Sequence, residues 1–326
     1  VYAYSERFML VLSHDEVVHG KASMLGKMPG TREEQFANLK ASYGYMMCHP
    51  GKKLLFMGQD IGEYDEWNEN REVEWYLTKE ADHKGLQEFV KALNHLYTSA
   101  PALSVKDTSW DGFEWIDCIS ANECTLSFVR KGKKDEDMLL VVVNFANVER
   151  KGFQVGVPLN GKYKEILNSD AKEYGGEGRT NPRVKTALEE EWDGREYSIK
   201  MTQAPLSVSI FSYQPYTKEE LKEIARKKAE KARKEKEAAR KKKNAKKTAS
   251  GRAAKTLKEE LAEKVFAAEA EISEKGEVEK PVRVTKPRKR AVQAAETEET
   301  AEMPETAETE ETPGTAKTAE NREVTK

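Results

Sequence analysis

The residues best suited to chemistry are Ser13-His14-Asp15-Glu16, which directly follow an apolar run at 8–12. An imidazole can donate a hydrogen bond to a substrate, and a carboxylate can stabilise positive charge that develops on one. The apolar run lacks polar alternation, which predicts a strand buried on both faces in a parallel sheet covered by helices. Such sheets and barrels carry their chemistry at the C-terminal ends of strands. His14 and Asp15 are therefore the leading candidates for a functional site.

A metal site is the first alternative, because two histidines lie near acidic residues. His14 and His19 are five residues apart, whereas a spacing of four puts two ligands on one helical face. The sequence has no His-Glu-x-x-His motif, so neither a metal nor another cofactor is predicted. The second alternative is structural, with the polar residues only capping the next helix. His19 is assigned to substrate contact or to orienting the loop, and an ordinary hydrogen-bonded histidine is an equal alternative.

The ten residues Leu-Ser-His-Asp-Glu-Val-Val-His-Gly-Lys at 12–21 are similar to the fourth conserved motif of the alpha-amylase superfamily, in the form found in 1,4-alpha-glucan branching enzymes. The resemblance extends over about residues 1–215. Its other segments are Lys27-Met28-Pro29-Gly30, Phe36-Ala37-Asn38-Leu39, 50–58, Glu66-Trp67-Asn68, Val73-Glu74-Trp75, 93–97, Pro101-Ala102-Leu103 and 165–170. A bare His-Asp pair would be weak evidence, whereas this extended agreement makes the chain similar to the C-terminal portion of such enzymes.

The resemblance implies roles for the two leading candidates. Asp15 would be the third carboxylate of the site, which hydrogen-bonds sugar hydroxyls and holds them more strongly as positive charge develops on the ring. His14 would donate a hydrogen bond to the same sugar. The implied nucleophilic aspartate and acid/base glutamate lie on the fourth and fifth barrel strands and would precede Val1. Asp15 and Glu16 cannot replace them, because neighbouring side chains on an extended segment point to opposite faces.

The polar loop after the second predicted strand is expected to supply further substrate contacts. Tyr64 and Trp67 are placed where aromatic faces could stack on sugar rings, with core packing as the alternative. Core packing is the favoured interpretation for Trp75. Asp60 lies at the predicted catalytic rim, where related enzymes often carry a glutamate, and it is assigned to substrate binding.

The resemblance implies a reaction for the complete protein, a glycosyltransferase of glycogen biosynthesis. It would cut an alpha-1,4 bond, keep the glucan as a covalent glycosyl-enzyme, and pass it to a 6-hydroxyl to make an alpha-1,6 branch by the retaining route. The alternatives are an alpha-glucan hydrolase of the same superfamily and a non-catalytic glucan-binding fragment with a charged interaction tail. Because the reacting carboxyl groups are expected before Val1, the chain of 326 residues alone is expected to be inactive.

The overall pattern predicts an α/β part followed by an all-β part. Helical spacing at 32–48 and 82–97 predicts two helices, and 53–57 predicts a second buried strand. Together with the strand at 8–12 they make two strand-helix units. Such units suit the C-terminal part of a (β/α)8 TIM barrel, assigned to residues 1–104.

Residues 105–216 are predicted to form an antiparallel β-sandwich, the all-beta C-terminal domain that the resemblance implies. Turn-forming pairs such as Asn160-Gly161 and Asp193-Gly194 separate its strands. The predicted strands are 113–118, 125–130, 138–145, 163–167, 197–201 and 206–213.

The last third of the chain has a different composition. Residues 217–280 are predicted to form a charged, partly helical tail, and 281–326 a disordered acidic tail rich in Thr, Glu and Ala. Residues 217–256 hold 17 Lys or Arg against 6 Glu. This basic segment could contact nucleic acid, ribosomes or another acidic surface. Charge runs are more often solvated, so a nucleic-acid partner is not predicted.

Charge and cysteine content suggest the partner and the compartment. Residues 1–216 hold 33 acidic and 26 basic residues, a net charge of −7, which suits a neutral polysaccharide such as an alpha-1,4-glucan or glycogen. No apolar stretch is long enough to span a membrane, and no signal peptide is visible, so no membrane contact is expected. The 3 cysteines are an odd, sparse set that favours reduced thiols in the cytoplasm over a disulfide framework.

Overall fold

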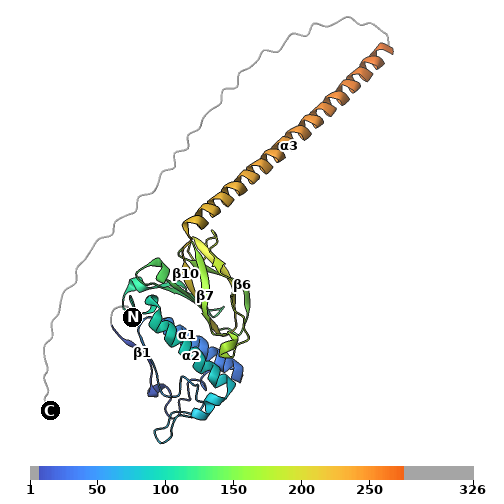
Figure 1. The fold of residues 1–326 in the computed structure, drawn as a ribbon. Coiled ribbons are helices and arrows are strands. Elements are labelled where there is room, and N and C mark those ends of the chain that lie inside the picture. The colour runs from blue at the N-terminus through green and yellow to red at the C-terminus, as the bar shows by residue number, and fades with distance from the viewer. Residues whose placement is uncertain (1–6, 275–326) are drawn as a thin grey trace, which may run out of the picture. The chain divides into compact units, whose positions relative to one another are not determined.

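A computed structural model describes the backbone of residues 7–274, with side chains described except at 243–255 and 268–274. The chain divides into two compact units, 1–242 and 243–326. The first unit holds all the strands and the helices α1 and α2 (Figure 1). The predicted acidic tail at 281–326 lies outside the described residues.

The first unit begins with two parallel strands, β1 (Met9–Leu12) and β2 (Lys52–Leu55), joined through helix α1 (Arg32–Cys48). Helix α2 (Ala81–Ser99) follows, so the predicted order of strand, helix, strand and helix is confirmed. Burial of β1 on both faces is not observed. Met9 and Val11 are each 48% exposed, because β2 is the only strand that pairs with β1 in the part of the chain that the structure describes.

The start of α1 is encoded locally. The Thr31 side chain accepts a hydrogen bond from the backbone of Glu34, and the Glu34 carboxylate accepts one from the backbone of Thr31 at 2.7 Å. This reciprocal cap satisfies two N–H groups that the first helical turn leaves without partners. The predicted helix at 32–48 is confirmed with both of its bounds.

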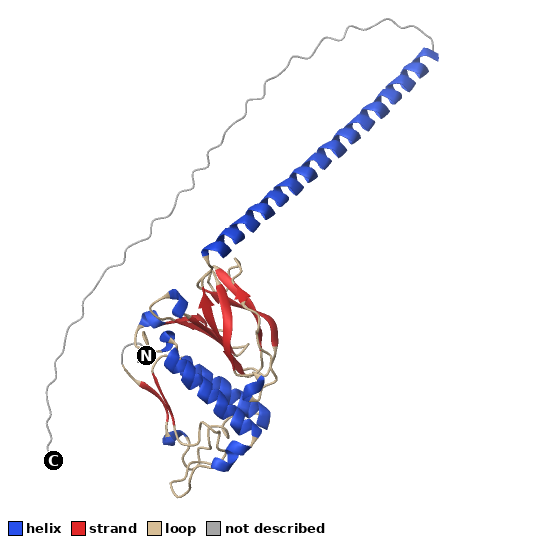
Figure 2. Cartoon of the chain, viewed as in Figure 1, coloured by secondary structure: helices blue, strands red, loops and turns tan. Residues whose placement is uncertain are grey.

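The remaining strands of the unit form antiparallel sheets (Figure 2). Six strands lie in the order β3-β4-β5-β10-β7-β8, and β6 pairs with β9. Their bounds are β3 Phe113–Asp117, β4 Thr125–Arg130, β5 Leu139–Asn144, β6 Arg150–Val157, β7 Lys162–Asn168, β8 Lys185–Thr186, β9 Tyr197–Gln203 and β10 Ser207–Gln214. The antiparallel all-beta prediction is confirmed, although β6 and β8 were not predicted.

Several single 3-10 turns connect these elements. They are η2 His14–Glu16, η3 Trp75–Lys79, η4 Pro101–Leu103, η5 Trp110–Gly112, η6 Asp135–Asp137 and η7 Lys172–Tyr174. Two of them matter for the site, because η2 directly follows β1 and η3 ends the loop that follows β2.

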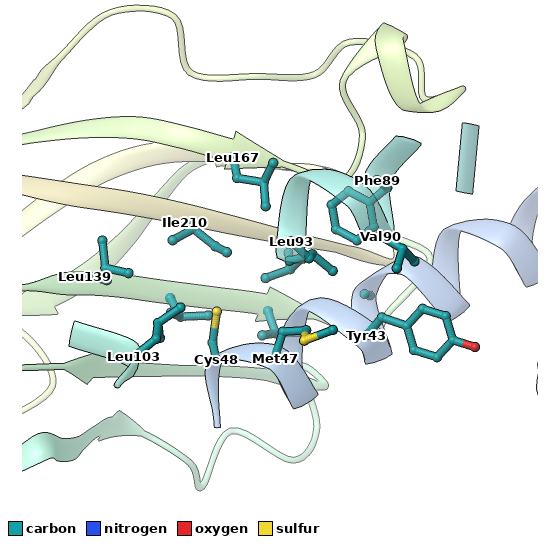
Figure 3. Close-up of a cluster of buried hydrophobic side chains, with 14 of the residues drawn as sticks. Tyr43, Met47, Cys48, Phe89, Val90, Leu93, Leu103, Leu139, Leu167 and Ile210 are labelled. Carbon is teal, nitrogen blue, oxygen red and sulfur yellow. The ribbon is translucent and has the colours of Figure 1, made fainter. Parts of the chain in front are cut away.

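The six-stranded sheet is buried on both faces. Along β5, Val141 and Val143 pack in a core with α1 and α2, whereas Leu140 and Val142 pack in a second core with β6 and β9. This alternation follows from the two-residue period of a strand. Figure 3 shows the first core, where Met47 of α1 and Leu93 of α2 lie beside Ile210 of β10. The assigned boundary after residue 104 stays a prediction, and a single hydrophobic core crosses it.

Helix α1 lies against the sheet at a glycine. A Cβ atom added at Gly44 would meet Cγ1 of Val208 in β10 at 2.3 Å. No side chain fits at that distance without movement of the helix or the strand. Gly44 therefore permits the close contact between α1 and the six-stranded sheet.

A buried ion pair also joins the α/β elements to the sheet. Arg130 of β4 is fully buried and donates to Asp107 Oδ1 at 2.9 Å, to the Cys48 carbonyl at 2.7 Å and to the Gly112 carbonyl at 3.2 Å. Asp107 also accepts from the backbone of Gly51 at 3.1 Å. The guanidinium thus links the end of α1 and the start of β2 to the sheet.

Helix α3 spans Lys218–Glu274. Its first turn is tied to β7 by an ion pair between Lys162 and Glu220 at 2.9 Å, and its third turn to the loop between β8 and β9 by one between Lys228 and Glu189. The predicted helical tail at 217–280 is therefore helical as far as residue 274, and 275–280 lie outside the described residues. No helix in the described part of the chain is long and apolar enough to cross a membrane.

Candidate functional site

The candidate site begins where β1 ends. Ser13 caps η2, because its hydroxyl accepts a hydrogen bond from the backbone of Asp15 at 3.3 Å. His14 and Asp15 both remain exposed, with His14 Nε2 lying 3.4 Å from Asp15 Oδ1. The capping alternative therefore applies to Ser13 and leaves the Asp15 carboxylate open to solvent. The backbone of this turn is further held by Lys21, whose Nζ donates to the Asp15 carbonyl at 2.6 Å.

Three rings from different segments meet beside Asp15. The His14 ring lies 5.8 Å from Trp67 and 6.0 Å from Phe56, and the Phe56 and Trp67 rings lie 5.4 Å apart at 84°. Phe56 directly follows β2, and Trp67 belongs to the loop after it. Edge-to-face contacts of this kind fix ring orientation and add about 0.5–1.5 kcal/mol per aromatic pair. The ends of both parallel strands therefore lie close together at His14.

The loop after β2 also holds the segment that follows η2. The backbone N–H of Trp67 donates to the Val17 carbonyl at 2.9 Å. The Glu66 carboxylate accepts from the backbone of Gly20 at 2.9 Å and of Ala22 at 2.7 Å. These two backbone donors lower the pKa of Glu66, because they favour the charged carboxylate. Glu66 and Trp67 therefore form hydrogen bonds to both ends of segment 17–22.

His19 lies on this hydrogen-bonded segment and is fully exposed. Its Nδ1 is 3.4 Å from Glu66 Oε2. An open cleft of about 760 Å³ is lined by His19 and by polar side chains that include Asn68, Asn70 and Arg71. Amide and guanidinium groups are suited to hydrogen-bond the hydroxyls of a sugar.

Tyr64 is not part of the group around His14. Its hydroxyl donates to Gln35 Oε1 at 3.2 Å, and its ring lies 6.5 Å from Phe36 and 6.1 Å from His83. The guanidinium of Arg32 lies 5.4 Å from the same ring. Tyr64 therefore packs against α1 and α2. Tyr64 also lines the cleft that His19 lines, and its assigned stacking role stays a prediction.

Asp60 lies at a different cleft from His19. This cleft has a volume of about 810 Å³ and is lined by residues of α1, β2 and α2, including Lys53 and Asn94. Phe56 lines the same cleft and is the residue that connects it to the rings around His14. The assignment of Asp60 to substrate binding stays a prediction.

Comparison with known proteins identifies the all-beta part. The family model described as "Alpha amylase, C-terminal all-beta domain" matches residues 115–214. These residues are therefore similar to that domain of the alpha-amylases. The match covers β3 to β10, which are the strands of the two antiparallel sheets.

Curated relatives extend the likeness beyond the all-beta domain. The chain is 47% identical over 226 residues to the 1,4-alpha-glucan branching enzyme GlgB of Geobacillus stearothermophilus, covering 69% of the chain and 35% of the relative. The GlgB of Aquifex aeolicus is 47% identical over 213 residues, covering 65% of the chain and 34% of that relative. The chain thus spans about a third of the length of the curated relatives it matches. The resemblance to branching enzymes is confirmed.

A solved structure described as AmyP in complex with maltose covers 64% of the chain and 41% of its own, with a TM-score of 0.43 and 15% identity. A likeness at this level supports no conclusion about the fold or the function of this chain.

The two tryptophans of the loop after β2 differ in exposure. Trp75 is 59% exposed on η3, so the favoured interpretation of core packing is wrong for Trp75. Trp67 is half-buried because its ring packs on His14 and Phe56. Exposure in a loop depends on which distant element the loop contacts, and sequence spacing does not report this.

The structure adds Phe56 and Glu66 to the residues predicted from the sequence. Glu66 belongs to the Glu66-Trp67-Asn68 segment that marks the resemblance, but its partner Gly20 is 46 residues away in sequence. Among the described residues, no group of three or more His, Cys, Asp or Glu side chains is arranged to hold a metal ion.

Proposed function

We propose that this chain is part of a 1,4-alpha-glucan branching enzyme. Such an enzyme cuts an alpha-1,4 bond of a glucan and transfers the released chain to a 6-hydroxyl, which makes the alpha-1,6 branches of glycogen. The observation that carries the proposal is the 47% identity over 226 residues to a protein named as a branching enzyme. The proposed substrate and product are therefore alpha-glucans.

We propose that β1, α1, β2 and α2 are two consecutive strand-helix units of a (β/α)8 barrel. The parallel pairing of Met9 with Lys52 and of Leu12 with Leu55 supports this assignment. So does the exposure of Met9 and Val11, because apolar side chains on a parallel sheet are normally covered. In a closed barrel, the ends of both strands would face the same catalytic rim.

The proposed role of Asp15 is electrostatic. In a retaining glycosyl transfer, the sugar ring gains positive charge as the bond to the leaving group breaks. A carboxylate that hydrogen-bonds the ring hydroxyls binds this transition state more tightly than the ground state, and so lowers the barrier. The exposed Asp15 side chain, on a turn capped by Ser13 and held by Lys21, is available for such contacts.

His14 is proposed to donate a hydrogen bond to the same sugar. Its ring is oriented by Phe56 and Trp67, which limits the directions in which its N–H groups can point. The contribution of Trp67 would then come from orienting His14, with stacking on sugar as a further role for its remaining exposed face. His19 and Asn68 would contact hydroxyls of a glucan lying in the cleft they line.

Two carboxyl groups on opposite sides of the scissile bond are required for a double displacement. We assign neither to the chain of 326 residues. The chain alone is therefore proposed to be inactive, and the activity is proposed for the complete protein. Its cysteines Cys48, Cys118 and Cys124 are all free, which supports a reducing, cytoplasmic compartment.

The test is the Asp15→Asn variant of the complete enzyme that carries this chain. Removing one group that stabilises transition-state charge should lower turnover by about 10²–10³, with little change in melting temperature because Asp15 is exposed. Branch points would be counted as chains released from amylose-derived product by a debranching enzyme. Release of reducing sugar by the unmodified enzyme without new alpha-1,6 links would make it a hydrolase. Normal turnover with a lowered melting temperature would make Asp15 structural.

A further inference from the structure

Lys218–Lys242 is the part of α3 that lies in the first unit, and its side chains are described. Four of its lysines are neutralised within the helix by glutamates four residues away. These pairs are Lys227–Glu223 at 2.7 Å, Lys231–Glu235 at 3.9 Å, Lys234–Glu230 at 2.7 Å and Lys241–Glu237 at 2.9 Å. Pairs of this spacing stabilise a solvated helix by about 0.2–0.5 kcal/mol each.

Five other cations of this helix have no such partner. They are Lys222, Arg226, Arg233, Lys236 and Arg240, which make no hydrogen bond or ion pair within 4 Å to any side chain that the structure describes. The pKa of Glu223 is lowered mainly by Lys227, with a smaller contribution from the charge of Arg226, so that arginine interacts with it only at longer range. Lys218 and Lys242, at the two ends of this stretch, are likewise unpaired within the described residues.

The five cations form one stripe along the helix. They are spaced four, seven, three and four residues apart. At about 100° of rotation per residue, this spacing keeps all five within an arc of about 80°. The first and last residues of the stripe are 18 positions apart, so at about 1.5 Å per residue the stripe is about 27 Å long. Lys218 lies in line with it, and Lys242 does not.

The stripe faces away from the sheet to which the helix is tied. Glu220 and Lys228 bond to the sheet and its loops, and the half-buried Ile224 lies between them on the helix. These three positions lie on the side of the helix opposite the stripe, by the same rotation per residue. The anchored side and the cationic side are therefore separate, and docking of α3 leaves the stripe free.

The chemistry of the stripe fits a chain of phosphates. Arginine binds phosphate oxygens through two parallel hydrogen bonds, and three of the five cations are arginines. A membrane surface fits less well, because a basic helix that lies on lipid needs an apolar face. Leu221 and Ile224 are the only large apolar side chains between 218 and 242.

We propose that Lys222, Arg226, Arg233, Lys236 and Arg240 form a surface that binds the phosphodiester backbone of nucleic acid without regard to base sequence. Each phosphate that is neutralised releases bound counterions. The logarithm of the binding constant should therefore fall with the logarithm of salt by about 0.7 for each contact with a single strand. Five contacts predict a slope of about −3.5, which makes the interaction strong at low salt and weak at high salt.

The test uses two variants of the 326-residue chain. The stripe variant is R226Q/R233Q/K236Q/R240Q, and the matched control is K227Q/K231Q/K234Q/K241Q. Both remove four positive charges from the same stretch of helix, and glutamine keeps a helix propensity close to that of lysine and arginine. Binding of a fluorescent 24-nucleotide single-stranded RNA of mixed sequence would be followed by anisotropy between about 50 and 200 mM salt, the range over which phosphate contacts are strongly screened. Circular dichroism would check that both variants keep their helix.

The stripe variant should lose at least about tenfold in affinity at the lowest salt, and its salt slope should become shallower by nearly 3. The control should lose much less, because its lysines are already neutralised by glutamates. Equal losses of RNA affinity in the two variants would mean that binding depends only on net charge, and would contradict a binding surface formed by the stripe. Failure of the unmodified chain to bind RNA would also overturn it, as would stripe-dependent binding to anionic vesicles with no binding to RNA. None of these readouts involves a glucan, so they leave the branching proposal untouched.

Discussion

The parallel strand pair and the antiparallel sheet of the first unit are stabilised in different ways. The six-stranded sheet is buried on both faces, with Val141 and Val142 fully buried in two separate cores. Strand β1 pairs with one strand among the described residues and leaves Met9 and Val11 half exposed. The residues at its end are held by hydrogen bonds and ring contacts. Stability is therefore concentrated in the sheet, and the candidate chemistry is carried by a segment that depends on a few polar contacts.

The largest contrast is expected between Phe128→Ala and Val11→Ala. Phe128 is fully buried in the core that joins α1 and α2 to the sheet, so its truncation should lower the free energy of unfolding by about 3–5 kcal/mol. Val11 is half exposed, and its truncation should cost less than about 1 kcal/mol. Denaturant unfolding of the chain measures both.

The same pair sharpens the barrel proposal when it is measured in the complete enzyme. Val11→Ala should then become more costly, because further strands and helices would cover that side chain. An unchanged, small cost in the complete enzyme would contradict the assignment of β1 to a closed barrel.

The next effect concerns the ion pair that joins the two regions. Arg130→Met should lower the free energy of unfolding by up to about 3–5 kcal/mol, because it removes the buried guanidinium paired with Asp107 and leaves that buried carboxylate only the exposed ammonium of Lys52, at 3.4 Å. Adding Asp107→Asn should recover part of that loss. A double-mutant cycle measures the coupling, and purely additive losses would mean that the pair does not link the regions.

A pH-dependent effect is expected at Lys40 of α1. Its ammonium is buried and donates to the Tyr174 carbonyl at 2.7 Å, and burial lowers the pKa of Lys40 to about 8. Between that value and the ordinary lysine value of about 10.4, the unfolded chain binds the extra proton, so folding becomes more favourable as pH rises. Relative to Lys40→Met, the unmodified chain should gain stability over this window. Lys84→Met, on the exposed face of α2, is the control and should show no such gain.

The smallest effect on stability, and the most specific for the site, is expected for Glu66→Gln. Gly20 and Ala22 donate to different oxygens of the Glu66 carboxylate, and glutamine replaces one of these oxygens with an NH₂ group that cannot accept, so one of the two hydrogen bonds is lost. Amide hydrogen exchange at these two positions should become faster, with little change in global unfolding. Glu72→Gln is the matched control, because Glu72 is exposed on the same loop and makes no hydrogen bond to the residues that the structure describes. Equal exchange in Glu66→Gln and the unmodified chain would show that Glu66 does not hold the segment.

The two hydrogen bonds that Glu66 accepts should weaken as pH falls. Its pKa is lowered in the folded chain, so the two hydrogen bonds are complete above the ordinary glutamate value of about 4.3 and are lost as pH falls through the lower value. Protection of Gly20 and Ala22 should therefore persist at neutral pH and disappear in acid. In Glu66→Gln, the acid-dependent step should be absent.

Local signals in the sequence predicted most of the elements. The helix at 32–48 was predicted with both bounds from its helical spacing, and the structure shows that its first turn is also fixed by the reciprocal cap of Thr31 and Glu34. Strand β6 was missed because it opens with Arg150-Lys151-Gly152, and Gly152 has a positive φ of 69°. Strand β8 has only 2 residues, too few to show alternation.

The sequence nominates candidate site residues where one motif contains them, and gives no signal where contacts between distant segments bring residues together. His14 and Asp15 lie in one short motif at the end of a strand. The hydrogen bonds of Glu66 to Gly20 and Ala22, and the exposure of Trp75, depend on how the loop after β2 folds. Such contacts follow from tertiary packing, for which neither spacing nor composition supplies a signal.

Gly44 lets the all-beta domain affect the candidate site, although that domain does not line the site. Helix α1 joins the two strands whose ends carry His14 and Phe56, and at Gly44 it lies directly on Val208 of β10. Contact with the sheet therefore sets the distance between α1 and the sheet. A larger residue at either position would lift the helix and move the ends of β1 and β2 relative to each other. Changes in the all-beta domain can therefore alter the relative positions of His14 and Phe56 from the far side of the helix.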